Sequence, residues 1–90
     1  MRETEIVASI VAGDPNGLAL AYGQYADPLY KFCRSVLGDP ADAADAVQDT
    51  FVVAAAKLGG LRDPGRLRPW LFAVARNECR HQLDGPRVSR

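Results

Sequence analysis

GDPADAADAVQDTFVVAAAKLGG, residues 38–60, is the stretch that decides the fold, because it carries a helix together with its start and stop signals. Asp39 is a favoured N-cap residue and Pro40 suits the first helical position, while the glycine pair at 59–60 favours a stop. At about 100° per residue, one apolar set falls within about 80° of the helix surface. We expect this set to form the buried stripe: Ala43, Val47, Phe51, Ala54 and Leu58.

Glycine and proline divide the rest of the chain into further helical segments. We predict helices over residues 3–12, 17–37, 40 to about 58, and 66–83. Gly13 ends the first helix, residues 14–17 are interpreted as a turn and 60–65 as a loop, and Asp84-Gly85-Pro86 as the end of the last helix. Pro28 follows Asp27 and favours either a kink or a restart of its helix. Because no strand alternation occurs, the prediction is an all-α fold, a small bundle of four helices, or five if Pro28 breaks one.

The size and composition of the chain restrict its class. Ninety residues make one small domain at most. No apolar run approaches the ~18 residues of a membrane span, and the first five residues do not resemble a secretion signal. We therefore expect a cytoplasmic protein without membrane insertion.

No pattern of residues in the sequence indicates catalysis or the binding of a metal or cofactor. Two cysteines, Cys33 and Cys79, are too few for a disulfide scaffold and have no ligand cluster for zinc, so we expect reduced thiols in or near the core. The sequence contains one histidine and lacks a nucleophile motif or a phosphate-binding glycine loop. We predict no enzyme activity, no catalytic residue, no metal, no cofactor and no small-molecule substrate.

The net charge is zero, but the charges are segregated along the chain. Residues 1–49 hold eight acidic and three basic residues, a net −5, whereas residues 50–90 hold three acidic and eight basic residues, a net +5. This polarity indicates two partners, one basic and one acidic. The alternative is charge scatter in a short chain.

The helix over 40–58 carries acidic and amide side chains on the side away from its buried stripe: Asp42, Asp45, Gln48 and Asp49. None has a Lys or Arg partner four residues away, so their repulsion is uncompensated within the helix. Val52 and Ala56 continue this side as an apolar strip. A docking surface for a basic helix and an ordinary solvated face are both compatible with this pattern.

The last helix is predicted to bury Leu67, Trp70, Leu71 and Val74. Another arc of about 100° holds donors suited to phosphates and base edges: Arg66, Arg76, Asn77 and Arg80. Arg62 and Arg68 extend this patch into the loop and the first turn. Alternatively, the basic face pairs with the acidic half of the domain. Trp70 could stack on a base, although its place in the apolar stripe favours the core.

Two segments, at this spacing, resemble the ECF (extracytoplasmic function) sigma factors of bacterial RNA polymerase. Residues 38–51, GDPADAADAVQDTF, are similar to the family segment GD..DAEDVVQETF, and residues 70–77, WLFAVARN, to its WL..IA.N signature. The upstream residues 12–14 and 25–30 also suit the opening helices of the family. Ala44 departs from the usual glutamate, which weakens the inference at that position only.

The resemblance implies the region 2 domain of such a factor, spanning residues 1–86, with 87–90 beginning a linker. It implies that Asp45, Gln48 and Asp49, with Asp42 and Val52 beside them, dock on the clamp coiled coil of the polymerase β′ subunit. The loop 61–67 would capture a base flipped from the non-template strand of the promoter −10 element. The helix carrying Arg76, Asn77 and Arg80 would follow that strand. An anti-sigma factor is a further implied partner.

A complete factor of this family also has a helix-turn-helix domain for the −35 element, which nothing after Val88 could supply, so we interpret the chain as a fragment rather than a truncated member. The main alternative function is a helical protein-interaction module without nucleic-acid binding. A stand-alone helix-turn-helix repressor is disfavoured, because the turn before the last helix is longer than three or four residues.

Overall fold

The computed structural model describes residues 3–57, 61 and 63–84 of the chain. It contains four α-helices, α1 (Glu3–Val11), α2 (Pro15–Leu37), α3 (Pro40–Lys57) and α4 (Leu67–Asp84), and one short 3-10 helix, η2 (Pro64–Arg66). No strand occurs in these ranges. The all-α prediction is confirmed.

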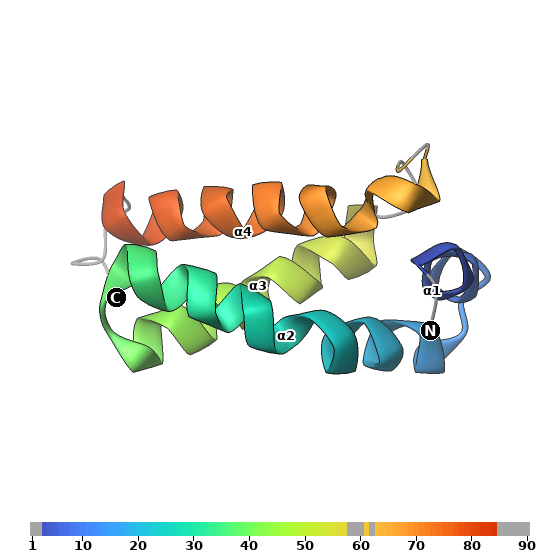
Figure 1. The fold of residues 1–90 in the computed structure, drawn as a ribbon, viewed down its shortest axis with the longest axis horizontal. Coiled ribbons are helices and arrows are strands. Elements are labelled where there is room, and N and C mark those ends of the chain that lie inside the picture. Colours follow the sequence, from blue (N-terminus) through green and yellow to red (C-terminus); the bar gives the residue numbers. More distant parts are fainter. Residues whose placement is uncertain (1–2, 58–60, 62, 85–90) are drawn as a thin grey trace.

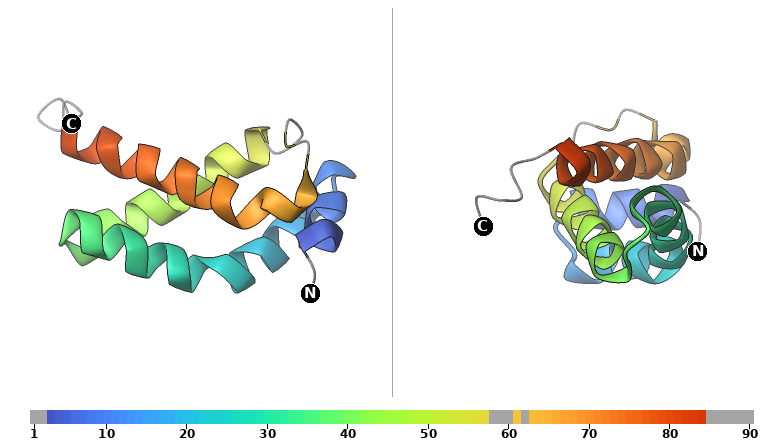
Figure 2. Two further views of the ribbon diagram at one scale, coloured as in Figure 1. Left: turned by 45° about the horizontal axis from the view of Figure 1, so that its top comes forward. Right: turned by 90° about the vertical axis from the view of Figure 1, so that its left-hand side faces the viewer.

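The three long helices form a bundle, and α1 lies across one end of it (Figure 1). α2 and α4 run in the same direction with α3 antiparallel to both, and the end-on view shows the three packed around one interior (Figure 2). All four α-helices contribute to the core, which includes Ile6, Leu29, Cys33, Phe51, Leu71 and Cys79. α1 also contacts η2 and the start of α4.

α2 begins earlier than predicted and is not broken. Asp14 is its N-cap, accepting a 2.9 Å hydrogen bond from the Asn16 amide, so Pro15 and Asn16 belong to the helix rather than to a turn. The helix then continues through Pro28 to Leu37. The restart at Pro28 is therefore not observed, and the segment is one helix. The buried Leu29 that follows shows that core packing holds this segment helical.

The start of α3 is set as the sequence predicts. The Asp39 carboxylate accepts hydrogen bonds from the amides of Ala41 at 2.8 Å and Asp42 at 3.1 Å. Before it, Gly38 has the left-handed conformation, φ 79°, that ends α2. The four described members of the predicted stripe are buried; Leu58 and the glycine pair at 59–60 lie outside the described residues.

The buried face of α4 differs from the predicted one. Leu67 and Leu71 are 1% exposed as expected, but the stripe continues through Ala75, Cys79 and Gln82. The predicted members Trp70 and Val74 are only half-buried. The buried side of α4 therefore does not centre on Trp70 and Val74, because α4 packs against α2 as well as α3.

A close approach fixes α1 against the start of α2. A Cβ atom at Gly17 would lie 2.7 Å from the backbone nitrogen of Ile10 and from Cβ of Ser9, so only glycine fits there. Through this contact α1 is held beside η2, which belongs to the segment before α4.

Candidate nucleic-acid and protein interfaces

The outer side of α3 is an exposed surface of carboxylate, amide and valine side chains, here called the acidic face: Asp45, Gln48, Asp49 and Val52. Val52 is 64% exposed. Asp45 and Asp49 form no ion pair within the described part of the chain. Ala56 is exposed as well, so the predicted apolar strip beside the carboxylates is present.

Asp42 precedes Asp49 by two helical turns and so lies on nearly the same side of α3. It is half-buried in the first turn of α3, and its backbone carbonyl accepts a 2.9 Å hydrogen bond from Nε2 of Gln82 on α4. Asp42 therefore lies at the edge of the acidic face nearest α4, and its part in docking stays a prediction.

An apolar hollow of about 340 Å³ borders the acidic face on its α2 side and is called here the α2–α3 groove. Its lining comprises Leu18, Tyr22, Gln48, Phe51, Val52 and Ala55. Tyr22 is 51% exposed, and its ring lies 5.0 Å from that of Phe51. The sequence analysis did not identify this groove, because it depends on how α2 crosses α3.

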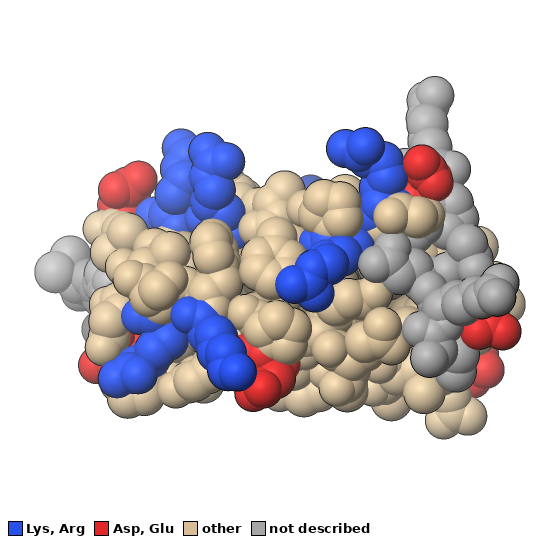
Figure 3. Space-filling model, viewed as in Figure 1, with Lys and Arg blue, Asp and Glu red and all other residues tan. Residues whose placement is uncertain are grey.

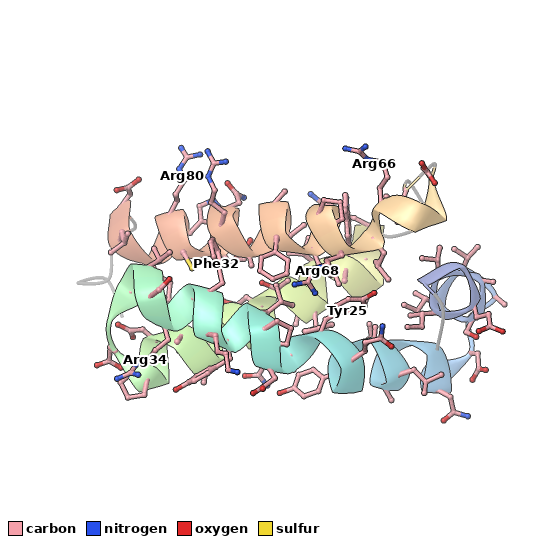
Figure 4. The ribbon with its side chains drawn as sticks, viewed as in Figure 1. Tyr25, Phe32, Arg34, Arg66, Arg68 and Arg80 are labelled. Atoms are coloured by element: carbon pink, nitrogen blue, oxygen red, sulfur yellow. The ribbon has the colours of Figure 1, made fainter. Side chains whose placement is uncertain are left out.

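The outer side of η2 and α4 carries the predicted donors, here called the basic face: Arg66, Arg76, Asn77 and Arg80, all exposed. Figure 3 shows Lys and Arg side chains gathered over α4. In Figure 4, Arg66 and Arg80 project away from the other helices. Arg62 lies outside the described residues.

Arg68 lies on a different side of α4. Its guanidinium carbon sits 5.0 Å from the centre of the Phe72 ring, and Phe72 in turn packs edge-on against Phe32 of α2 at 5.6 Å. Figure 4 shows Arg68 pointing toward α2. The structure therefore separates Arg68 from the basic face.

A groove of about 610 Å³ runs between α3 and α4 and is called here the Trp70 groove. It is lined by Val53, Lys57, Trp70, Ala73, Val74, Asn77, Glu78 and His81. A second hollow, of about 370 Å³, is lined by Leu61, Asp63, Arg66, Pro69, Trp70 and Ala73. Trp70 and Ala73 are common to both, so the half-buried indole stands where the hollows adjoin. The expectation of a core tryptophan is thus only partly met.

The acidic and basic faces are not neutralised by each other. Two ion pairs lie within single helices and link Lys31 to Asp27 at 3.7 Å and His81 to Glu78 at 3.8 Å. None of the described arginines of η2 and α4 forms an ion pair with Asp45 or Asp49 of the acidic face. For these two carboxylates, the alternative in which the basic face pairs with the acidic half is therefore not observed.

The two thiols are buried and free. Cys33 and Cys79 are each 0% exposed and form no disulfide. Burial, aided by the hydrogen bond with Cys79, raises the pKa of Cys33 from 9.0 to about 12, and burial likewise raises the pKa of Cys79. A thiol in such surroundings is unreactive at neutral pH.

The described ranges hold neither a metal-ligand cluster nor a membrane-spanning helix. No cluster of three or more His, Cys, Asp or Glu side chains suits a metal ion. None of the helices in these ranges has both the length and the apolar character needed to cross a bilayer.

Comparison with known proteins gives consistent matches. The sequence model of the sigma-70 region 2 family matches residues 21–85. The ECF RNA polymerase sigma factor BldN of Streptomyces coelicolor is 32% identical over 77 residues, which cover 84% of this chain and 29% of BldN. SigM of Bacillus subtilis is 38% identical over 56 residues, covering 62% of this chain and 34% of SigM. SigL of Mycobacterium tuberculosis is 33% identical over 72 residues, covering 79% of this chain and 41% of SigL.

The chain thus matches between 29% and 41% of the length of these relatives. No solved structure gives a significant match. The matches therefore concern one part of each relative and not the functions of the whole protein.

Proposed function

Because the chain belongs to the sigma-70 region 2 family of ECF sigma factors, we propose that it docks on core RNA polymerase and recognises and helps melt the promoter −10 element. It is a transcription initiation component and not an enzyme. The observation that carries the proposal is the separation of an acidic face on α3 from a basic face on α4, without ion pairs between them in the described residues. Each face is available for a partner of opposite charge.

The acidic face is proposed to bind the clamp coiled coil of the β′ subunit. Asp45 and Asp49 repel each other across one turn of α3, and a cationic helix would relieve this repulsion. Val52 and the adjacent α2–α3 groove offer apolar contact area beside the charges. Charge complementarity would direct association and register, while apolar burial would supply affinity.

The basic face is proposed to follow the non-template strand of the −10 element. Arg66, Arg76 and Arg80 would contact phosphates, and Asn77 can donate to and accept from a base edge. Unstacking a base costs a few kcal/mol. Stacking on an aromatic ring recovers about 1–3 kcal/mol per base, and Trp70 stands beside the hollow formed with the loop residues Leu61 and Asp63.

We expect the free domain to bind duplex DNA weakly. Its net charge is zero, and only a few arginines can replace counterions on phosphates. Affinity for promoter DNA should therefore arise beside polymerase, in the cytoplasm. The assignment of residues 1–86 to region 2 and of 87–90 to a linker stays a prediction, since 85–90 lie outside the described residues.

An anti-sigma factor is proposed to cover the same surface that binds polymerase. Tyr22 and Val52 are 51% and 64% exposed beside the acidic face, which is unusual for large apolar side chains grouped at one hollow. A regulator that buries them would prevent docking by occupying the same atoms.

The test is capture of core polymerase by the tagged chain and by its Asp45→Arg variant. We expect Asp45→Arg to reduce recovery about tenfold or more, because it places a cation against a cationic partner. Asp84→Arg, the same charge change at the exposed end of α4, is the matched control and should retain recovery. Equal recovery by wild type and Asp45→Arg would remove the docking proposal.

A further inference from the structure

We propose that the Trp70 groove is a second nucleobase subsite, on the α3 side of α4, and that the Glu78 carboxylate makes it select guanine. This inference rests on the proposed function, because it requires that the strand reach α4. The subsite is distinct from the hollow beside Leu61 and Asp63, which takes the base held by the loop, and it adjoins that hollow at Trp70.

The groove is placed where a strand on the basic face would direct its bases. Along α4, its lining residues recur at helical spacing over about 16 Å: Trp70, Ala73, Val74, Asn77, Glu78 and His81. Val53 and Lys57 of α3 form the opposite wall. Arg80 follows Asn77 by three residues and so borders the groove from the solvent side. Phosphates held at Arg76 and Arg80 would leave adjacent bases within reach of this lining.

The lining has the chemistry of a base pocket. Trp70 presents an aromatic surface for stacking, and the Asn77 amide both donates and accepts hydrogen bonds. A volume of about 610 Å³ is within the range of small-ligand sites, and apolar walls are supplied by Val53, Ala73 and Val74.

Glu78 is the group that can discriminate among bases. Its side chain is only 14% exposed, and its carboxylate lies 3.8 Å from the His81 imidazole on the next turn. A half-buried carboxylate is shielded from water, so its hydrogen bonds to a ligand are stronger than those of a surface carboxylate. An ionised carboxylate accepts hydrogen bonds and cannot donate them.

This acceptor-only character sets the order of preference. An unstacked guanine offers two adjacent donors, N1–H and the N2 amino group, which match the two carboxylate oxygens. Adenine and cytosine each offer one amino group on the same edge. Thymine offers N3–H between two carbonyl oxygens, which the carboxylate repels. The expected order is guanine first, adenine and cytosine next, and thymine last.

The test uses core polymerase assembled with this chain and fluorescein-labelled single-stranded oligothymidine of about 12 nucleotides. One position at a time carries G, A or C, and binding is followed by anisotropy. At one position of the strand, the wild-type complex should prefer G to T by roughly tenfold. Glu78→Gln, which keeps the shape but adds a donor, should reduce that preference to about threefold or less.

Two controls distinguish guanine selection by Glu78 from strand binding itself. Asp84→Asn removes the same charge from the same helix outside the groove and should retain the full preference. Circular dichroism melting of Glu78→Gln should match wild type. An unchanged guanine preference in Glu78→Gln, or wild-type binding without base preference, would overturn the inference alone. Failure of the wild-type complex to bind any oligonucleotide would overturn the proposed function and the inference with it.

Discussion

The side chain of Gln82 donates a hydrogen bond from Nε2 to the backbone carbonyl oxygen of Asp42, at 2.9 Å, and thereby joins the last turn of α4 to the first turn of α3. The two residues are 40 positions apart in the sequence. Gln82 is 6% exposed, so the contact is largely shielded from water. The helix that carries the acidic face and the helix that carries the basic face are thus fixed relative to each other by a polar contact as well as by apolar packing.

Replacing Gln82 with leucine should destabilise the domain. The substitution keeps the volume but removes the donor, which leaves the Asp42 carbonyl without this shielded partner at a cost of about 1–2 kcal/mol. Urea unfolding followed by circular dichroism measures the change. Gln24→Leu, at an exposed position of α2, is the control and should stay within about 0.5 kcal/mol of wild type. Equal unfolding midpoints for the two variants would contradict the importance of the contact.

Gly17→Ala should destabilise the domain, and Gly23→Ala should not. The new Cβ at position 17 would lie 2.7 Å from Cβ of Ser9 and from the Ile10 nitrogen, so α1 would have to move, at about 1–3 kcal/mol. At Gly23, nothing lies within 4 Å of the added atom, and removing glycine from the interior of α2 should stabilise by about 0.5–1 kcal/mol. Thermal melting of both variants measures the difference. Shifts of the same sign would show that the close approach is not tight.

The buried thiols predict a loss of stability in alkali. The pKa of Cys33 rises from 9.0 to about 12 on folding, so between these values the unfolded chain has released a proton that the folded chain keeps. The stabilisation is complete below about pH 9 and is lost as the pH rises toward 12. The free energy of unfolding should fall more steeply between pH 8 and 10.5 in wild type than in a Cys33→Ala, Cys79→Ala double variant. Parallel curves for the two proteins would exclude the thiols as the cause.

Local signals in the sequence were sufficient for α3 and insufficient for α4. The Asp39 cap, Pro40 and the alanine-rich stripe of α3 act within one helix, so periodicity alone identifies its buried face and its exposed carboxylates. In α4, the prediction placed Trp70 and Val74 in the core because they are large apolar residues on one side of the helix. The observed core uses Cys79 and Gln82, whose burial depends on partners in α2 and α3.

The grooves were not predictable from the pattern of one helix. Tyr22 becomes part of the α2–α3 groove only because α2 places it against Phe51. Glu78 and Lys57 belong to the Trp70 groove because α3 and α4 pack side by side. The charge segregation that suggested two partners is visible in the sequence, whereas the hollows beside the charges follow from tertiary packing.

Reversing the charges of Arg76 and Arg80 should abolish strand binding while leaving polymerase capture intact. Both side chains are exposed on the outer side of α4 and form no ion pair in the described residues, so Arg76→Glu, Arg80→Glu should retain the fold. Losing two phosphate contacts should also lower the slope of log affinity against log salt by about 1.4 for a single strand. Anisotropy of a labelled non-template −10 strand bound to the polymerase complex, measured across a salt series, gives both quantities.

The matched control for this reversal is a double charge change on another helix, Lys31→Glu with Arg34→Glu on α2, which alters net charge equally at exposed positions. If net charge alone governed binding, the two double variants would weaken it to the same extent. We expect the α4 pair to lose at least about tenfold more affinity than the α2 pair, because only the α4 pair lies on the basic face with Asn77. Unchanged strand binding in the α4 double variant would favour a helical protein-interaction module without nucleic-acid contacts.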